Sequence, residues 1–442
     1  MIWRRRLFLA LVLLVAGGGI PLSRAVQHVR AAQATPAATL PAAAAMASRP
    51  APGQPAAALA ATRGSRPESG TTPGPAAPAP NLQIEAKAAA VMEYATGELL
   101  FEKDASERLP LASVTKVMTF GLFLEALHEG RMKLTDMVEA SAHACSMGGT
   151  QIWLEPGERM SVKDLLYAVA VGSANDAAVA LAEHLEGSED AFVAKMNEKA
   201  KELGLSNTHF VNVTGLPAPD HYSSARDIAV MSRWALGIPD FTHYTSTWDY
   251  YVRKGSEDEV WLTTFNKLLK AYPGYDGIKT GFTNEAGYCL ASTAKRGGLR
   301  IIAVVLGEPT PKARNKDVIA LLNYGFGQFR AEKVAHSGEQ VALVNVQKGR
   351  AQRVPGVLAE ELYGTFRRGA QPNWRKEAII PQRVVAPVQK GQVLGKYVIW
   401  DGQRKVAETK IIAAAAVERG SLLDLIKQVT RQIFASLFKL PW

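Results

Sequence analysis

The chain has 442 residues, of which 47% are hydrophobic and 21% are charged, as is ordinary for a globular protein of two or three domains. Its net charge of +10 lies at the two ends: residues 1–82 contain 8 Lys and Arg against 1 acidic residue, and residues 332–442 contain 18 against 9. A nucleic-acid-binding protein usually carries its basic residues on its main domain. The charge distribution therefore argues against nucleic acid as a partner and favours an anionic membrane or cell wall.

The first 25 residues have the features of a cleaved export signal. Three arginines, Arg4 to Arg6, precede an apolar run over residues 7–20, and Ser23-Arg24-Ala25 offers small residues for cleavage. The run is short for a membrane-spanning helix, which disfavours an uncleaved anchor. Residues 26–82 are rich in Ala and Pro and predict a disordered linker. We expect an exported protein at the outer face of the cytoplasmic membrane or in the cell wall.

Hydrophobic patterns between residues 83 and 330 predict one domain of mixed composition. Strands are expected at 88–94 and 98–101, helices at 113–128, 162–171, 176–185 and 191–203, a turn at 273–277, strands at 278–283, 288–294 and 299–306, and a helix at 315–329. Strands therefore lie at both ends with helices between them. This order predicts an α+β fold, with an antiparallel sheet flanked by helices and an inserted helical lobe.

Two further segments follow this domain. Residues 331–418 alternate apolar and polar positions between Gly and Pro turns, which predicts a small β-rich domain. Residues 419–442 place Leu422, Ile426, Val429 and Ile433 at intervals of three and four, as in an amphipathic helix, and the segment is basic. Such a helix either packs on its own domain or lies on a membrane surface. Export and basic charge favour the membrane surface, with this helix as an anchor.

Three short motifs in a fixed order predict the chemistry. They are Ser113-Val114-Thr115-Lys116, Ser173-Ala174-Asn175 and Lys279-Thr280-Gly281. Ser113 and Lys116 lie one turn apart on the same face of the predicted helix. A serine hydroxyl is a poor nucleophile unless a base removes its proton, so Lys116 has to be neutral to serve as that base. Lowering a lysine pKa to near 7 costs roughly 4–5 kcal/mol, which burial and a second cation would supply.

The other two motifs complete a site for serine acyl transfer. Lys279 is expected to be the second cation and to keep its own charge for a substrate carboxylate. Asn175 and Ser173 are expected to form hydrogen bonds with the two sides of the site. Ser173 is also expected to pass a proton to the leaving amine. Taken singly, the motifs have simpler interpretations: a capped helix with a solvated lysine, a pair of capping residues, and an exposed edge strand. Their joint occurrence favours the catalytic interpretation.

No other constellation in the sequence predicts a different chemistry. The eight histidines form no metal-binding motif and no phosphate-binding loop is present, so we expect neither a metal nor another cofactor. His221 and Asp227 are interpreted as loop and helix-cap residues instead of members of a catalytic triad. Cys145 and Cys289 are expected to be small buried side chains without a disulfide bond.

With these motifs placed, residues 83–330 resemble the low-molecular-mass penicillin-binding proteins, specifically the serine-type D-alanyl-D-alanine carboxypeptidases. The resemblance also includes Met147-Gly148-Gly149-Thr150-Gln151 and Asn212-Val213-Thr214-Gly215-Leu216. It implies a β-lactamase/transpeptidase-like fold, a peptidoglycan stem peptide as substrate and β-lactams as inhibitors. The β-rich segment and terminal helix resemble the second domain and membrane anchor of the family.

The resemblance also implies roles for individual residues. Ser113 would attack the penultimate carbonyl and release D-alanine, and water would then hydrolyse the acyl-enzyme. The backbone N–H groups of Ser113 and Phe282 would form the oxyanion hole. Lys279 and Thr280, with Gly281 beside them, would bind the terminal carboxylate. The family often has histidine where this chain has Phe282, and we expect this difference to alter detail without abolishing activity.

Three alternatives remain open at this point. A class A β-lactamase would need a glutamate after the second motif, and residues 209–219 contain none. An endopeptidase that cuts peptidoglycan cross-links would use the same residues as the carboxypeptidase. A non-catalytic wall-binding scaffold is disfavoured because all the expected catalytic residues are intact.

Overall fold

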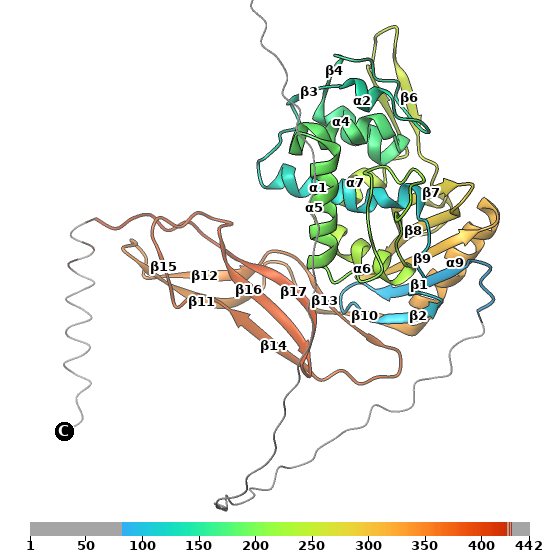
Figure 1. Ribbon diagram of the computed structural model, residues 1–442. Coiled ribbons are helices and arrows are strands. Elements are labelled where there is room, and N and C mark those ends of the chain that lie inside the picture. Colours follow the sequence, from blue (N-terminus) through green and yellow to red (C-terminus); the bar gives the residue numbers. More distant parts are fainter. Residues whose placement is uncertain (1–81, 422–423, 425, 427–442) are drawn as a thin grey trace, which may run out of the picture. The chain divides into compact units, whose positions relative to one another are not determined.

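The first domain is built on a five-stranded antiparallel sheet, seen in a computed structural model that describes residues 82–421, 424 and 426. The strand order is β2-β1-β9-β8-β7, so strands from the two ends of the domain meet in one sheet (Figure 1). The strands are β1 (Ala88–Glu93), β2 (Leu99–Lys103), β7 (Tyr275–Thr283), β8 (Gly287–Arg296) and β9 (Leu299–Glu308). This arrangement confirms the predicted antiparallel sheet and leaves β7 at one edge.

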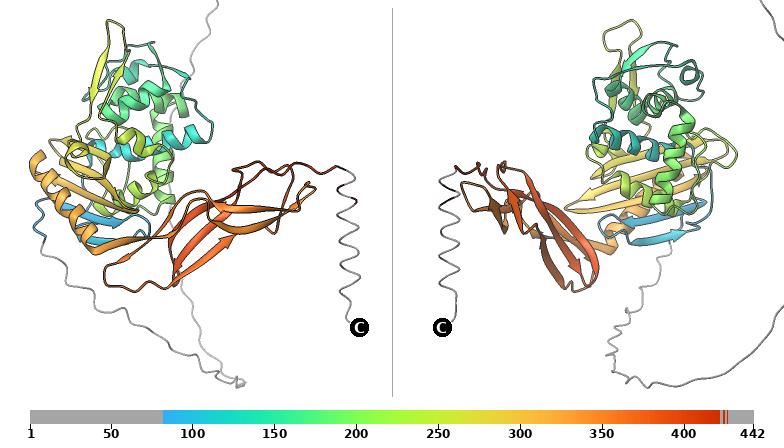
Figure 2. Two further views of the ribbon diagram at one scale, coloured as in Figure 1. Left: turned by 180° about the vertical axis from the view of Figure 1, so that it is seen from behind. Right: turned by 60° about the vertical axis from the view of Figure 1, so that its left-hand side comes forward.

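Helices cover both faces of the sheet. Each strand contributes side chains to both faces, because alternate side chains of a strand point in opposite directions. Ala89 and Val91 of β1 belong to one apolar cluster together with residues of α9 (Pro311–Gln328). Ala88 and Ala90 belong to the other cluster, which includes residues of α1 (Lys116–His128) and α6 (Ala225–Ala235). Figure 2 shows the sheet between these helices from two further directions. The central strands are therefore buried on both sides.

Between β2 and β7 the chain forms a helical lobe, as predicted. Its remaining elements are β3 (Met137–Glu139), α2 (Ala142–Cys145), β4 (Arg159–Ser161), α3 (Val162–Tyr167), α4 (Asn175–Glu186), α5 (Glu189–Glu202), α7 (Phe241–Thr245), β5 (Asp249–Val252), β6 (Val260–Thr263) and α8 (Leu268–Ala271). Ser161 caps α3, because its side chain accepts a hydrogen bond from the backbone N–H of Asp164. A π-helical segment at Ala168–Gly172 then carries the chain directly into the second motif.

The second domain is rich in β-strands. A six-stranded sheet has the order β14-β16-β17-β12-β11-β15, and β10 pairs with β13. The bounds are β10 (Phe329–Ala335), β11 (Gln340–Gln347), β12 (Arg353–Leu358), β13 (Leu362–Arg367), β14 (Trp374–Ile379), β15 (Arg383–Val385), β16 (Val393–Asp401) and β17 (Arg404–Ala413). Val354, Ile399 and Ile411 are fully buried in its own apolar cluster. The domain therefore has a core of its own.

Some expectations differ from the structure or fall outside it. Residues 273–277 were predicted as a turn, but β7 already begins at Tyr275, where pairing with β8 extends the strand. Both cysteines are free as expected, although Cys145 is only partly buried. The export signal, the linker up to residue 81 and most of the predicted terminal helix lie outside the described residues. Within the described part, no helix has both the length and the apolar content that crossing a membrane requires.

Candidate functional site

Ser113 lies in a short 3-10 turn, Ala112–Thr115, that leads into α1. The sequence predicted that the helix would begin at Ser113, whereas α1 begins at Lys116. Two glycines bring other parts of the backbone against this turn. A Cβ atom at Gly281 of β7 would lie 2.8 Å from the carbonyl oxygen of Leu111, and one at Gly215 would lie 1.9 Å from that of Ala112. Only glycine fits these approaches, so the serine is held between β7 and the loop of Gly215.

Lys116 is almost fully buried beside the serine. Its Nζ lies 3.2 Å from Oγ of Ser113 and donates to Oδ1 of Asn175 at 2.6 Å and to the carbonyl oxygen of Thr214 at 2.8 Å. Desolvation by burial, and after it the positive charge of Lys279, hold the pKa of Lys116 well below its usual range. The nearby Asp176 opposes this shift and does not reverse it. Lys116 is therefore suited to act as a neutral amine.

The three neighbours of Lys116 also orient that amine. A neutral lysine has two N–H donors and one lone pair. Asn175 Oδ1 and the Thr214 carbonyl can only accept hydrogen bonds, so they take the two donors. The lone pair is then directed toward Ser113, whose hydroxyl can donate its proton to Nζ. This arrangement has the geometry of a nucleophile and its general base.

The second motif supplies one fixed side chain and one unpartnered side chain. Asn175 Nδ2 donates to the carbonyl oxygen of Gly148 at 2.7 Å, and its backbone N–H donates to that of Thr150. Ser173 has a left-handed backbone conformation, with φ of 59°. Its buried Oγ has no hydrogen-bond partner among the described residues, so the predicted contact to the two sides is not made here. The hydroxyl is available to a substrate, and such unpartnered, strained residues are typical of functional sites.

The third motif lies on the edge strand β7, but it is not an exposed edge, because Lys279 and Thr280 are both buried. Burial, and then the positive charge of Arg314, lower the pKa of Lys279 to about 7. The sequence-based expectation that Lys279 keeps its charge for a substrate carboxylate stays a prediction, and the lowered pKa places its titration near neutral pH. A bound carboxylate would favour the charged form again. Phe282 is half exposed and stacks on Tyr288, with ring centroids 4.3 Å apart.

Sequence reasoning missed several residues that support the site. Arg314 of α9 is buried and places a second positive charge near Lys279. Asp176 follows Asn175 and accepts the backbone N–H groups of Ile152 and Leu154, which fixes the loop beside the second motif. Neither residue belongs to the three motifs. What distinguishes both residues is a charged side chain that is buried. Burial is known only once the fold is known, so the sequence alone could not identify them.

His221 also has a more specific place than the loop role predicted for it. Its Nδ1 accepts the backbone N–H of Val211 at 3.0 Å, which leaves the proton of the neutral ring on Nε2. Nε2 lies 2.8 Å from Oγ1 of Thr115, which itself donates to the carbonyl oxygen of Ala112. The histidine therefore supports the turn that carries Ser113. Asp227 lies in the first turn of α6, as predicted. Its carboxylate accepts hydrogen bonds from the backbone N–H of Asn207 and from the hydroxyl of Thr208.

The described residues contain no group of three or more His, Cys, Asp or Glu side chains that could hold a metal ion. The side chains gathered at Ser113 are instead Lys116, 3.2 Å away, and Asn175, which accepts a hydrogen bond from Lys116, while the charge of Lys279 acts on Lys116. These are the residue types that serine acyl transfer with an amine base requires.

Comparison with known proteins identifies the family. The model of the D-alanyl-D-alanine carboxypeptidase family matches residues 74–310, and that of the penicillin-binding protein 5 C-terminal domain matches residues 329–419. The chain belongs to the D-alanyl-D-alanine carboxypeptidase family. It is a hydrolase of the serine peptidase class, with the fold and second domain of that family.

Individual relatives agree along most of the chain. D-alanyl-D-alanine carboxypeptidase DacF of Bacillus subtilis is 44% identical over 78% of this chain and 90% of its own. DacC of Escherichia coli is 33% identical over 80% of this chain and 91% of its own. Among solved structures, penicillin binding protein 5 of Haemophilus influenzae is 32% identical, covers 76% of this chain and 98% of its own, and has a TM-score of 0.56. The similarity therefore includes both domains.

Proposed function

We propose that this chain removes the terminal D-alanine from peptidoglycan stem peptides through an acyl-enzyme on Ser113. The observation that carries the proposal is the position of Lys116, buried and 3.2 Å from Ser113 Oγ, with its two N–H donors taken by Asn175 and Thr214. Family membership supplies the substrate class, and the site supplies the groups for acylation.

In the acylation step, Ser113 Oγ attacks the carbonyl carbon of the penultimate D-alanine while its proton passes to Nζ of Lys116. The negative charge that develops on the carbonyl oxygen is stabilised by the backbone N–H groups of Ser113 and Phe282. The C–N bond then breaks, and the leaving amine receives the proton held by Lys116 through the unpartnered hydroxyl of Ser173, which leaves Lys116 neutral again. D-alanine leaves and the peptide stays bound to Ser113 as an ester.

Deacylation uses the same groups in reverse. A water molecule attacks the ester carbonyl and gives its proton to the amine of Lys116. The C–O bond to Ser113 breaks and the serine recovers its proton, which releases the shortened peptide as a carboxylic acid. The enzyme returns to its starting state without a cofactor.

The terminal carboxylate is expected to bind at the third motif. Lys279 provides a positive charge and Thr280 a hydroxyl, while Gly281 keeps this part of β7 close to the nucleophile. Arg314 adds a second positive charge nearby. A β-lactam carries a carboxylate and an amide in a similar arrangement, so we expect it to acylate Ser113 and act as an inhibitor. An endopeptidase would use the same groups, and the structure offers no observation that favours it.

The export signal predicted at the N-terminus and the amphipathic helix predicted at the C-terminus support a location outside the cytoplasm. We propose that the enzyme is exported and held at the outer face of the cytoplasmic membrane by its basic terminal helix. The helix is tested by flotation with anionic liposomes. Full-length protein is expected to float and a chain ending at Gly420 is expected not to, whereas equal flotation would refute the anchor.

The activity is tested by the release of D-alanine from a synthetic pentapeptide ending in D-Ala-D-Ala. Wild type is expected to release one D-alanine per peptide. Ser113→Ala is expected to release none while keeping the circular dichroism spectrum of the wild type. Equal release by both proteins would contradict the role of Ser113.

A further inference from the structure

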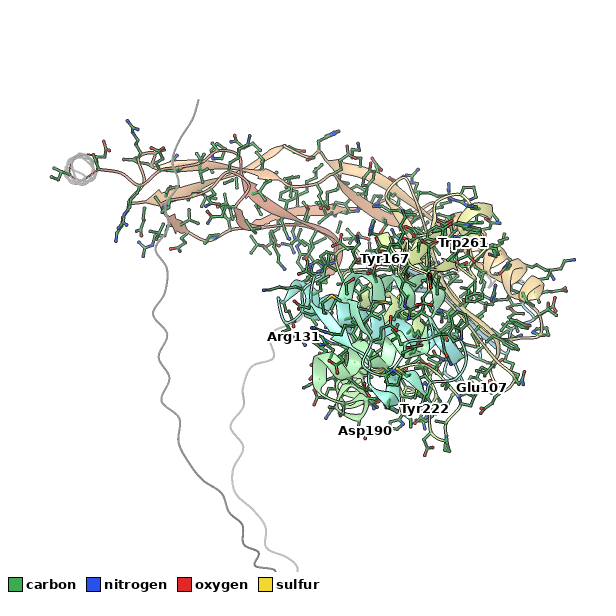
Figure 3. The ribbon with its side chains drawn as sticks, turned by 90° about the horizontal axis from the view of Figure 1, so that it is seen from above. Glu107, Arg131, Tyr167, Asp190, Tyr222 and Trp261 are labelled. Carbon is green, nitrogen blue, oxygen red and sulfur yellow. The ribbon has the colours of Figure 1, made fainter. Side chains whose placement is uncertain are left out.

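Three large aromatic side chains are exposed around the β5–β6 hairpin. They are Trp153, Tyr251 and Trp261, which are 67%, 41% and 58% exposed. Tyr251 and Trp261 are cross-strand partners, and their rings are nearly parallel, with an interplanar angle of 14° and centroids 6.2 Å apart. Figure 3 labels Trp261 among the side chains of this lobe. The two rings form a stacked apolar pair that is exposed to solvent.

The hairpin is fixed next to the proposed catalytic groups. Its inner face is buried through Val252 of β5 and Leu262 of β6. Leu262 packs against Gly172, the residue directly before Ser173. A Cβ atom at Gly172 would lie only 2.9 Å from Leu262 Cδ2. The outer aromatic face and the unpartnered Ser173 hydroxyl therefore belong to one packed unit.

Arg253 ties the hairpin to the loop that carries Trp153. Its guanidinium pairs with the carboxylate of Glu158 and donates to the carbonyl oxygens of Ile152 and Trp153. From the other side, Asp176 accepts the N–H groups of Ile152 and its neighbour Leu154. The backbone on both sides of Trp153 is thus held by the side chains of Arg253 and Asp176. Asp176 directly follows Asn175 in the sequence.

Trp153 combines an exposed side chain with an unfavourable backbone conformation. Its φ is 54°, a left-handed value that is sterically unfavourable for a bulky residue. A strained backbone that holds a tryptophan in solvent costs stability and gains no burial in return. Such strain, where the surroundings enforce it, is characteristic of binding sites. Exposed aromatic groups gathered next to a site are likewise typical of ligand contacts.

Polar groups lie beside the aromatic surface. A hollow of about 710 Å³ is lined by Tyr251 and Arg253 together with the charged side chains of Lys163, Asp164, Asp249 and Lys254. Flat apolar rings bordered by hydrogen-bonding groups suit a saccharide. The C–H face of a pyranose ring stacks on an aromatic ring, while its hydroxyl and acetamido groups bind polar side chains.

We propose that Trp153, Tyr251 and Trp261 bind the glycan strand to which the stem peptide is attached. The inference rests on the proposed function, because a stem peptide that enters the site at Ser113 brings its covalently linked N-acetylated sugars to the neighbouring surface. A cross-strand aromatic pair also stabilises a hairpin, which accounts for Tyr251 facing Trp261. It does not account for the strained, exposed Trp153.

The kinetic test compares two substrates on the full chain. One is a free pentapeptide ending in D-Ala-D-Ala, and the other is the same peptide attached to an N-acetylated disaccharide polymer. Trp153→Ala and Trp261→Ala are expected to lower kcat/KM for the glycan-linked substrate by about fivefold or more, as loss of an aromatic stacking contact implies. Values for the free peptide and the rate of penicillin acylation should stay within about twofold. Ile379→Ala, which removes an exposed apolar side chain of β14, is the matched control.

Equal losses on both substrates, or no loss on either, would overturn the glycan inference. A direct binding test separates this failure from failure of the proposed function. Ser113→Ala protein, which cannot turn over substrate, is sedimented with insoluble peptide-free glycan strands. Binding that disappears when Trp153 and Trp261 are also replaced by alanine supports the site, even if no D-alanine release is found. Equal sedimentation of the two proteins, or none, refutes it.

Discussion

Nζ of Lys116 lies 3.2 Å from Oγ of Ser113, and both of its other hydrogen-bond neighbours are carbonyl oxygens. Burial and the charge of Lys279 lower the pKa of this lysine, so the amine is available as a base. The serine is thereby activated without a histidine.

Replacing Lys116 should remove the base and leave the fold intact. We expect Lys116→Ala to slow acylation of Ser113 by a β-lactam by roughly 10²- to 10⁴-fold, the usual contribution of general base catalysis. Lys116→Arg should be equally slow, because a guanidinium does not lose its proton in this pH range. Stopped-flow measurement with a fluorescent penicillin gives both rates. Fast acylation of the arginine variant would show that a neutral amine is not needed.

The pH dependence should report the state of Lys279. The pKa of Lys279 is lowered to about 7 by burial and Arg314, and only the charged form attracts a carboxylate. The charged form is present below that pKa, so kcat/KM for the pentapeptide should fall as the pH rises through about 7. Lys279→Arg should move this fall to higher pH, since arginine stays charged. An unchanged descending limb in this variant would assign the fall to another group.

His221 should make stability depend on pH. Burial, and then the charge of His209, lower the pKa of His221 to about 4 from its ordinary value near 6.5. The unfolded chain therefore binds a proton that the folded chain does not, and the free energy of unfolding should fall as the pH drops from about 6.5 to about 4. The full effect is up to about 3 kcal/mol. Urea unfolding at pH 7 and pH 4.5 should show a smaller loss for His221→Gln than for wild type.

The control for this experiment is His336→Gln, because His336 is exposed in the second domain. It should lose as much stability in acid as the wild type does. The glutamine at 221 retains a donor toward Thr115, so acylation should persist in His221→Gln and decline in His221→Ala. If both variants acylate Ser113 at the wild-type rate, His221 does not position the nucleophile turn.

Gly215 should be intolerant of a side chain. A Cβ atom there would lie 1.9 Å from the carbonyl oxygen of Ala112, and its φ of 84° is already unfavourable for other residues. We expect Gly215→Ala to lower the free energy of unfolding by about 1–3 kcal/mol and to slow acylation. Gly204→Ala is a matched control, because Gly204 has a φ of 72° and open space around its Cα. If the two variants acylate equally fast, close packing at Gly215 does not position Ser113.

The sequence predicted the sheet, the helical lobe and the residues around the nucleophile because these depend on local patterns. The period of apolar residues predicted α1, α3, α4, α5 and α9, and it did not predict α6. Short motifs brought Ser113, Lys116, Asn175 and Lys279 into one hypothesis, and the fold places Lys116 against Ser113 and Asn175.

The remaining features depend on burial and on contacts between distant segments. Arg314 follows Lys279 by 35 positions and influences it only because α9 covers the sheet. The lowered pKa of Lys279 has the same origin, and no local pattern in the sequence indicated it. The contact of His221 with Thr115 joins residues 106 positions apart. No local sequence pattern predicts such a pair, because the role of His221 depends on partners that only the fold brings close to it.

The central claim, that Ser113 forms the acyl-enzyme, is tested most directly by intact-protein mass spectrometry after incubation with penicillin. The account predicts a mass increase of one penicillin in wild type and none in Ser113→Ala, with a peptide map that places the adduct on Ser113. The absence of an adduct in folded wild type would contradict the account and favour a non-catalytic scaffold. Rapid turnover of penicillin without a detectable adduct would favour a β-lactamase.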